Sequence, residues 1–165
     1  MMNTIKSFQI DHEKLEPGIY ESRVDKIGKG FCSAYVTTYD LRFTRPNREP
    51  PIDQSALHTI EHLGAVYLRN RAGYKDNIVY FGPMGCRTGF YLILGGKFEE
   101  MEVVRLVESM CGYILNSTKI PGAGPAECGN YLEHNLDLAK YYTEKYLDQI
   151  RLKYLNKRPC TPEFH

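Results

Sequence analysis

Residues 53–70 read DQSALHTIEHLGAVYLRN and predict an amphipathic helix around which the rest of the chain can be organised. Its apolar residues recur at helical spacing and form one face, made of Leu57, Ile60, Leu63, Gly64 and Tyr67. Asp53 or Ser55 can cap the amino-terminal end, because a short polar side chain accepts a hydrogen bond from the first turn. Gly73 favours an end to the helix soon after Asn70.

His58 and His62 lie four residues apart on this helix, so both imidazoles project from the same face and can bind one metal ion. Glu61 lies at the edge of that face, where it can act as a base rather than as a ligand. The pattern H-x-x-E-H is that of the inverted zincins. It can also arise by chance on a solvated face, but two histidines and a glutamate in an otherwise apolar stretch are costly to bury unless paired or coordinated.

A third ligand is required for a catalytic site with one open position. Cys128 is the best candidate, because it lies in the glycine-bearing loop GPAECGN (124–130), where a following helix would favour its thiolate. His134 is a weaker candidate, because the pattern places it one turn into a predicted helix as a surface or packing residue.

Cys86 lies in the segment GPMGCRTG (82–89), which predicts a tight turn between two strands. The guanidinium of the adjacent Arg87 would lower the pKa of the thiol and support an acid/base or nucleophilic role. A buried structural cysteine is the simpler alternative. The remaining cysteines are interpreted as structural or incidental: Cys32 in a strand, Cys111 on an apolar helix face and Cys160 in the C-terminal tail.

The flanking segments predict an α+β fold, an antiparallel sheet with helices packed on one face. An N-terminal arm of residues 1–18 precedes a hairpin of strands at 19–26 and 31–43, and further strands are expected at 77–82 and 88–94. Helices are expected at 98–116 and 131–155. We expect one catalytic domain over residues 1–165, because this length suffices for one core and not for two.

The composition is that of a globular protein, with 42% hydrophobic and 25% charged residues and a net charge of +1. This balance suggests neither a nucleic-acid nor a membrane partner. The chain shows no apolar run that could span a bilayer and no apolar signal core, so a cytoplasmic location is expected. Five cysteines without a signal peptide argue against a disulfide framework. No glycine-rich dinucleotide fingerprint is present.

Taken together, five ordered segments resemble the S-ribosylhomocysteine lyases, the LuxS family of autoinducer-2 synthesis. They are SFQIDH (7–12), YDLRF (39–43), LHTIEHL (57–63), GPMGCRTGFY (82–91) and AECGNY (126–131). The resemblance covers nearly the whole chain. It implies that His58, His62 and Cys128 are the metal ligands, with a water or substrate oxygen in the fourth position. One divalent ion per subunit is implied, Fe(II) in the family, with Zn(II) or Co(II) able to substitute; the donor set alone would favour zinc.

The resemblance further implies that Glu61 and Cys86 are the acid/base pair and that Ser7, His12 and Arg42 contact the substrate. It implies a homodimer with its active sites at the subunit interface. In the reaction, a Lewis-acidic metal and proton transfers move the sugar carbonyl from C1 to C2 and then to C3. Removal of the C4 proton then expels homocysteine from C5 and leaves 4,5-dihydroxy-2,3-pentanedione, the autoinducer-2 precursor.

Two positions depart from the family pattern: Tyr80 stands where many members carry an aspartate, and Thr38 where some carry a lysine. Two rival functions are open. An inverted-zincin zinc metallopeptidase would use Glu61 to activate water and would need a distal glutamate ligand, for which Glu99, Glu100, Glu102 and Glu108 are available. A non-catalytic metal-binding module would have four protein ligands and no open position.

Overall fold

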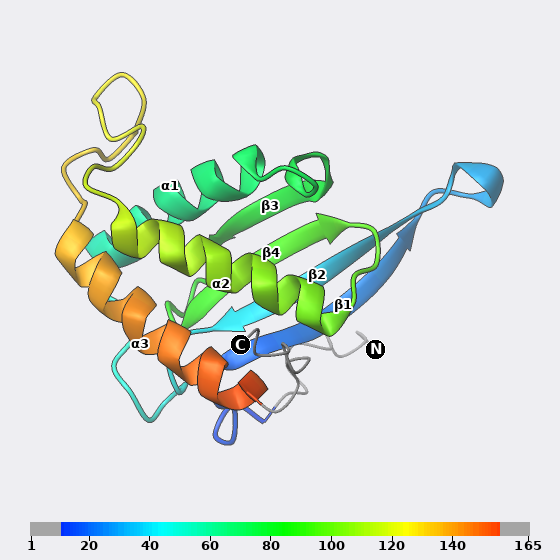
Figure 1. Cartoon of the computed structure of the whole chain (residues 1–165), viewed down its shortest axis with the longest axis horizontal. Helices are drawn as coiled ribbons and strands as arrows, with labels where there is room; N and C mark the ends of the chain where they lie inside the picture. Colours follow the sequence, from blue (N-terminus) through cyan, green and yellow to red (C-terminus); the bar gives the residue numbers. More distant parts are fainter. Residues whose placement is uncertain (1–10, 156–165) are drawn as a thin grey trace, which may run out of the picture.

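The computed structural model describes residues 11–155 as a four-stranded antiparallel sheet and three α-helices. The strand order is β1-β2-β4-β3, and the helices α1, α2 and α3 lie over the same face of the sheet (Figure 1). This arrangement confirms the predicted α+β fold. The predictions for Ser7 and Cys160 fall outside the described residues.

The sheet begins with a long hairpin of β1 (Gly18–Ile27) and β2 (Ala34–Arg42), and β4 (Gly89–Gly95) pairs with both β2 and β3 (Ile78–Pro83). Each strand lies within three residues of its predicted bounds at either end. The tip of the hairpin differs, because Gly30–Cys32 form a short 3₁₀ turn. Cys32 therefore lies exposed in that turn, and its prediction as a strand residue was wrong.

Helix α1 (Gln54–Asn70) follows the predicted pattern closely. The Asp53 side chain caps it by accepting a hydrogen bond from the Ser55 backbone N–H at 2.9 Å. Its buried face packs on the sheet, and at Gly64 the helix comes so close to Phe81 of β3 that an added methyl group would overlap the ring. The backbone of α1 is thereby held at a fixed distance from the sheet.

Helix α2 (Glu100–Asn116) begins with a capping box between Glu99 and Glu102. Cys111 lies on its buried face, as predicted, and burial raises the pKa of its thiol to about 12. This cysteine is consequently a protonated core residue at neutral pH.

Helix α3 (Leu136–Tyr154) begins five residues later than predicted. The reason is the Asn135 side chain, which accepts a hydrogen bond from Leu138 N–H at 2.9 Å and so fixes the cap one residue after His134. The Asn135 backbone N–H donates outside the helix, to the hydroxyl of Thr59 on α1 at 3.0 Å. The placement of His134 inside a helix was therefore wrong.

Two buried tyrosines of α3 donate hydrogen bonds to the backbone of β1. Tyr146 donates its hydroxyl hydrogen to the Gly18 carbonyl at 3.0 Å, and Tyr154 donates to the Ile19 carbonyl at 2.8 Å. Within residues 11–155, no helix is both long enough and apolar enough to cross a membrane.

Candidate metal centre and activated thiol

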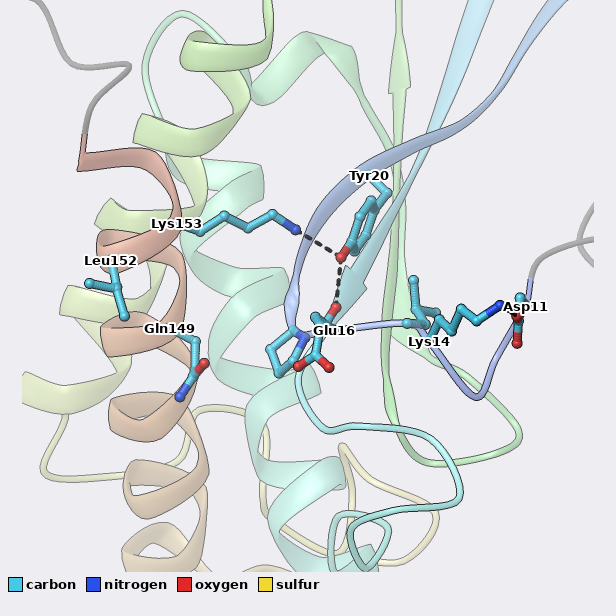
Figure 2. Close-up of a pocket in the computed structure, with 9 residues that line it drawn as sticks. Asp11, Lys14, Glu16, Tyr20, Gln149, Leu152 and Lys153 are labelled. Atoms are coloured by element: carbon cyan, nitrogen blue, oxygen red, sulfur yellow. Dashed lines mark hydrogen bonds and ion pairs between the residues drawn. The ribbon is translucent and has the colours of Figure 1, made fainter.

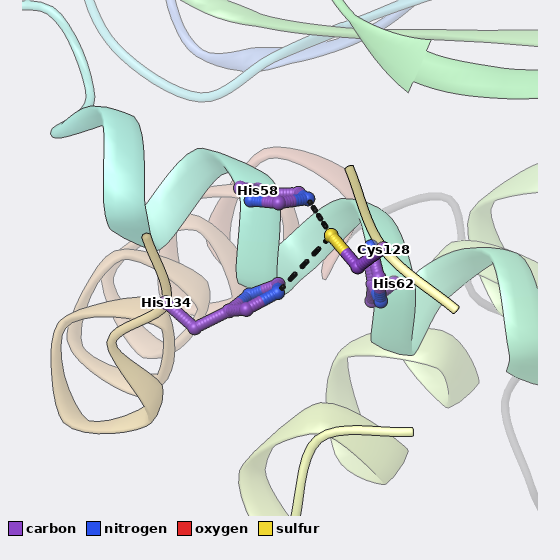
Figure 3. A group of neighbouring side chains, drawn as sticks. All are labelled: His58, His62, Cys128 and His134. Carbon is purple, nitrogen blue, oxygen red and sulfur yellow. Dashed lines mark hydrogen bonds between the residues drawn. The ribbon is translucent and has the colours of Figure 1, made fainter. Parts of the chain in front are cut away.

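Four side chains from two distant segments meet beside α1 (Figure 3). His58 and His62 project from one face of the helix, while Cys128 and His134 come from the irregular segment that precedes α3. All four are half-buried, and their donor atoms lie within 4.8 Å of one another. The structure thus brings together the three side chains for which a metal role is predicted, and it adds a histidine.

Backbone carbonyls orient the two helix histidines. The Nδ1 atom of His58 lies 3.0 Å from the Glu133 carbonyl oxygen, and that of His62 lies 2.9 Å from the Pro121 carbonyl oxygen. Because a carbonyl can only accept, each Nδ1 carries the hydrogen and each Nε2 keeps its lone pair for the centre. This outer hydrogen bond is the arrangement that metal-binding histidines use in proteins.

The donor spacing fits a small divalent ion. The Cys128 sulfur lies 3.4 Å from His58 Nε2 and also accepts a hydrogen bond from the Asn130 backbone N–H at 3.4 Å. Zinc-type bond lengths at tetrahedral angles place a nitrogen and a sulfur ligand about 3.6 Å apart. The imidazole and thiolate donors therefore suit a transition-metal ion such as zinc or iron.

His134 is the member of the cluster that sequence reasoning placed wrongly. Its ring stacks on that of His58 with centroids 4.0 Å apart, and its Nδ1 lies 3.2 Å from the Thr59 hydroxyl. Burial, followed by the neighbouring His58 and His62, lowers the pKa of His134, which favours the neutral ring. The available signal was Asn135, which is a good N-cap residue directly before an apolar helical pattern.

Glu61 lies half-buried on α1 between the two histidines in sequence. Among the residues that the structure describes, it is not one of the donors that gather with them. This placement agrees with a base rather than a ligand, and the catalytic role of Glu61 stays a prediction.

Cys86 forms a second group at the turn between β3 and β4. Its sulfur lies 3.1 Å from the Thr88 hydroxyl and 4.0 Å from a terminal nitrogen of Arg42. Burial alone would raise the pKa of this thiol, but the Thr88 hydrogen bonds and the Arg42 guanidinium outweigh it, so the pKa is lowered. The guanidinium that reaches the sulfur is thus that of Arg42 in β2, whereas the sequence pointed to the adjacent Arg87.

A buried ion pair holds Arg42 in this position. Arg42 and Asp40 are only 3% and 4% exposed, and Arg42 Nε donates to an Asp40 carboxylate oxygen at 3.1 Å, with a second bond to the other oxygen. Arg42 also donates to the Thr88 hydroxyl. Burial raises the pKa of Asp40, which the Arg42 guanidinium opposes and the half-buried His12 opposes more weakly. The substrate contacts predicted for Arg42 and His12 stay predictions.

The backbone connects the two groups. The Ile52 N–H donates to the Arg87 carbonyl at 2.8 Å, which joins the turn after Cys86 to the residue directly before the Asp53 cap of α1. The thiol and the two helix histidines therefore sit on elements that are fixed to each other at the start of α1.

A separate groove of about 540 Å³ lies between residues 11–17, the start of β1 and the C-terminal end of α3 (Figure 2). Across it, Lys153 Nζ donates to the Tyr20 hydroxyl at 2.8 Å, and that hydroxyl donates to the Glu16 carbonyl at 2.8 Å. Among residues 11–155, none of those with a predicted catalytic, metal or substrate role lines this groove.

A half-buried cluster of imidazole and thiolate donors, together with an activated thiol on an α+β domain, defines a candidate metal-dependent enzyme. Residues 5–157 match the model of the S-ribosylhomocysteinase (LuxS) family, and the chain belongs to this family of carbon–sulfur lyases.

Similar proteins agree with this assignment. The chain is 55% identical to an S-ribosylhomocysteine lyase of Borreliella burgdorferi (strain ZS7), over 88% of this chain and 91% of that protein. It is 49% identical to the S-ribosylhomocysteine lyase of Finegoldia magna, over 90% and 92% of the two chains. It is 46% identical to that of Clostridium acetobutylicum, over 94% and 98%.

Proposed function

We propose that this protein is an S-ribosylhomocysteine lyase that converts S-ribosylhomocysteine to L-homocysteine and 4,5-dihydroxy-2,3-pentanedione, the precursor of autoinducer-2. The observation that carries the proposal is the meeting of His58, His62 and Cys128 in a chain that matches such lyases over most of its length. The family match favours this reaction over peptide hydrolysis, which would have no use for the activated thiol of Cys86.

His58, His62 and Cys128 would hold one divalent ion, which would supply Lewis-acid polarisation of the sugar carbonyl and its neighbouring hydroxyl. We propose Fe(II) as the native ion, with Zn(II) or Co(II) able to replace it. The half-buried cluster suits this chemistry because partial exclusion of water strengthens the interaction between donors and ion.

Cys86 and Glu61 would move the protons. The lowered pKa of Cys86 favours the thiolate, which would take a proton from the carbon next to a carbonyl and return it to the neighbouring carbon. Two such transfers carry the carbonyl from C1 to C3. Loss of the C4 proton then breaks the C5–sulfur bond, and the electron pair leaves with homocysteine, which is protonated to the thiol. Glu61 serves the later transfers.

We also propose that Ser7, His12 and Arg42 contact the substrate and that the protein is a homodimer with its active sites at the interface. Exposed apolar and aromatic side chains on the strands support a partner: Tyr35 is 43%, Val79 54% and Tyr80 44% exposed. Sedimentation of the metal-loaded protein is expected to give twice the monomer mass.

The function is tested with metal-loaded protein and S-ribosylhomocysteine. We expect release of one thiol per substrate consumed, measured with a chromogenic thiol reagent, and no cleavage of a peptide library. Anaerobic loading with Fe(II), Zn(II) or Co(II) compares the ions in the same assay. Absence of thiol release by fully loaded protein with every ion would refute the proposal.

A further inference from the structure

The cluster contains one more imidazole than an open catalytic site requires. His134 lies directly before the Asn135 cap of α3, and its ring meets both helix histidines (Figure 3). It stacks on His58 with an interplanar angle of 24° and meets the edge of His62 at 74°, with centroids 4.8 Å apart. His134 is thus an additional imidazole beside the three side chains with a predicted metal role.

The hydrogen bonds of Thr59 determine which nitrogen of His134 carries the proton. The Thr59 hydroxyl donates its only hydrogen to the Ser55 carbonyl at 2.8 Å and accepts from the Asn135 N–H at 3.0 Å. Its contact with His134 Nδ1 at 3.2 Å must then be a bond that Nδ1–H donates. Nε2 of His134 consequently keeps a lone pair, which lies 3.9 Å from the Cys128 sulfur.

The ring geometry argues that His58 and His134 do not both bind the ion, and the distances to the Cys128 sulfur favour His58 as the ligand. Two imidazoles that bind one ion at a tetrahedral angle place their ring centroids about 5 Å apart. The pairs His58–His62 and His62–His134 both come close to this, at 4.7 Å and 4.8 Å, whereas His58 and His134 are stacked at 4.0 Å. In near-parallel stacked rings the Nε2 lone pairs point in similar directions, so they cannot converge on one ion at a wide angle. Of these two rings, His58 has its Nε2 nearer the Cys128 sulfur, at 3.4 Å against 3.9 Å for His134, so His58 is the ligand and His134 is not.

We propose that His134 does not bind the metal ion but binds the substrate: its Nε2 accepts a hydrogen bond from a substrate hydroxyl. This inference rests on the proposed function. The carbonyl end of the sugar would lie at the ion that His58, His62 and Cys128 would hold. A hydroxyl on the adjacent carbon would then come within reach of Nε2 of His134. Because a carbonyl cannot donate, the site would select for a hydroxyl beside the carbonyl.

The test uses Co(II)-loaded protein, in which the visible spectrum reports the ligands. For His134→Ala we expect a Co(II) dissociation constant within about threefold of wild type, because no ligand is lost, and an unchanged spectrum before substrate. The spectral response to S-ribosylhomocysteine should need roughly 10-fold more substrate or beyond, and kcat/KM should fall about 10- to 100-fold, the range for a lost hydrogen bond to a buried polar group. His58→Ala provides the contrast, with a large loss of Co(II) affinity.

Conservative variants separate this role from a structural one. His134→Gln keeps an acceptor and should recover part of the lost kcat/KM. Thr59→Val keeps the imidazole but removes the hydroxyl that accepts from both His134 Nδ1 and the Asn135 N–H, so it should weaken the substrate response, whereas Thr59→Ser should not. These variants also keep the test informative if His134→Ala does not fold.

Two results would overturn the inference: a loss of Co(II) affinity in His134→Ala as large as in His58→Ala, which would make His134 a ligand, or substrate responses and kcat/KM equal to wild type in both His134 variants. Failure of the proposed function would look different, because wild-type protein itself would then show neither thiol release nor a spectral response to S-ribosylhomocysteine.

Discussion

The metal cluster is half-buried and the Cys86 thiol is exposed, and the two are held in place in different ways. The cluster depends on helical spacing in α1 and on two loop carbonyls, those of Glu133 and Pro121. The Cys86 group depends on the sheet, where the buried pair of Asp40 and Arg42 aims a guanidinium at the thiol. Substitutions should therefore separate the two regions, with metal content reporting on the first and thiol reactivity on the second.

The largest effects are expected from removing the two cysteines in turn. Cys86→Ala should keep metal at the wild-type stoichiometry and lower turnover by roughly 10²- to 10⁴-fold, the usual contribution of an acid/base group. Cys128→Ala should lose both metal and activity, because two imidazoles hold an ion weakly. Elemental analysis after dialysis, together with the thiol-release assay, measures both. If Cys86→Ala loses the metal and Cys128→Ala retains it, the two roles must be exchanged.

The next largest effect, a loss of stability, is expected from breaking the buried ion pair that positions Arg42 beside Cys86. Asp40→Leu or Arg42→Met alone leaves the partner charge buried and unpaired, which is expected to cost about 3–5 kcal/mol in the free energy of unfolding. The double variant should recover most of this loss, because neither charge then remains. Urea denaturation of the four proteins measures the coupling. Additive losses in the double variant would mean that the pair does not act as a unit.

The difference between the metal cluster and the Cys86 group also explains which features could be predicted from the sequence. The fold class and helix α1 follow from periodicity, and the meeting of His58 with His62 follows from a four-residue spacing on one helix. The start of α3 does not follow from periodicity, because the Asn135 side chain and Thr59 of another helix determine it. His134 was misplaced for that reason.

The partner of Cys86 was missed for a related reason. Arg87 is adjacent in sequence, but its backbone adopts a φ of 57° in the turn, while Arg42 reaches the sulfur from a neighbouring strand. The pairing of β2 with β4 sets Arg42 opposite Gly89, and this register brings Arg42 to the turn. A register between distant strands has no local sequence signal, so spacing arguments favour the nearer residue.

A smaller loss of stability is expected from a substitution at the contact between α1 and the sheet. Gly64→Ala would press a methyl group into the Phe81 ring and against Met110, which is expected to destabilise the protein by about 1–3 kcal/mol. Gly112→Ala in α2 is the matched control, because within the described part of the chain its added methyl group would meet no atom of another residue's side chain or of a neighbouring element within 4 Å, and the change should be neutral or stabilising. The reactivity of Cys86 should not change in either variant. Equal stabilities of the two variants would show that α1 can move away from the sheet freely.

The smallest effect is expected from Thr88→Val. This variant removes the Thr88 hydroxyl, which contacts both Cys86 and Arg42, and should lower the free energy of unfolding by about 1 kcal/mol. The hydroxyl helps to lower the pKa of the Cys86 thiol, so its removal should raise that pKa. At a pH below the raised value the thiolate fraction falls, and the pH profile for alkylation of Cys86 by iodoacetamide should move to higher pH. Mass spectrometry of the Cys86 peptide isolates this signal from the other cysteines. Thr88→Ser should leave the profile in place. A profile that moves to lower pH in Thr88→Val would show that the hydroxyl stabilises the thiol rather than the thiolate.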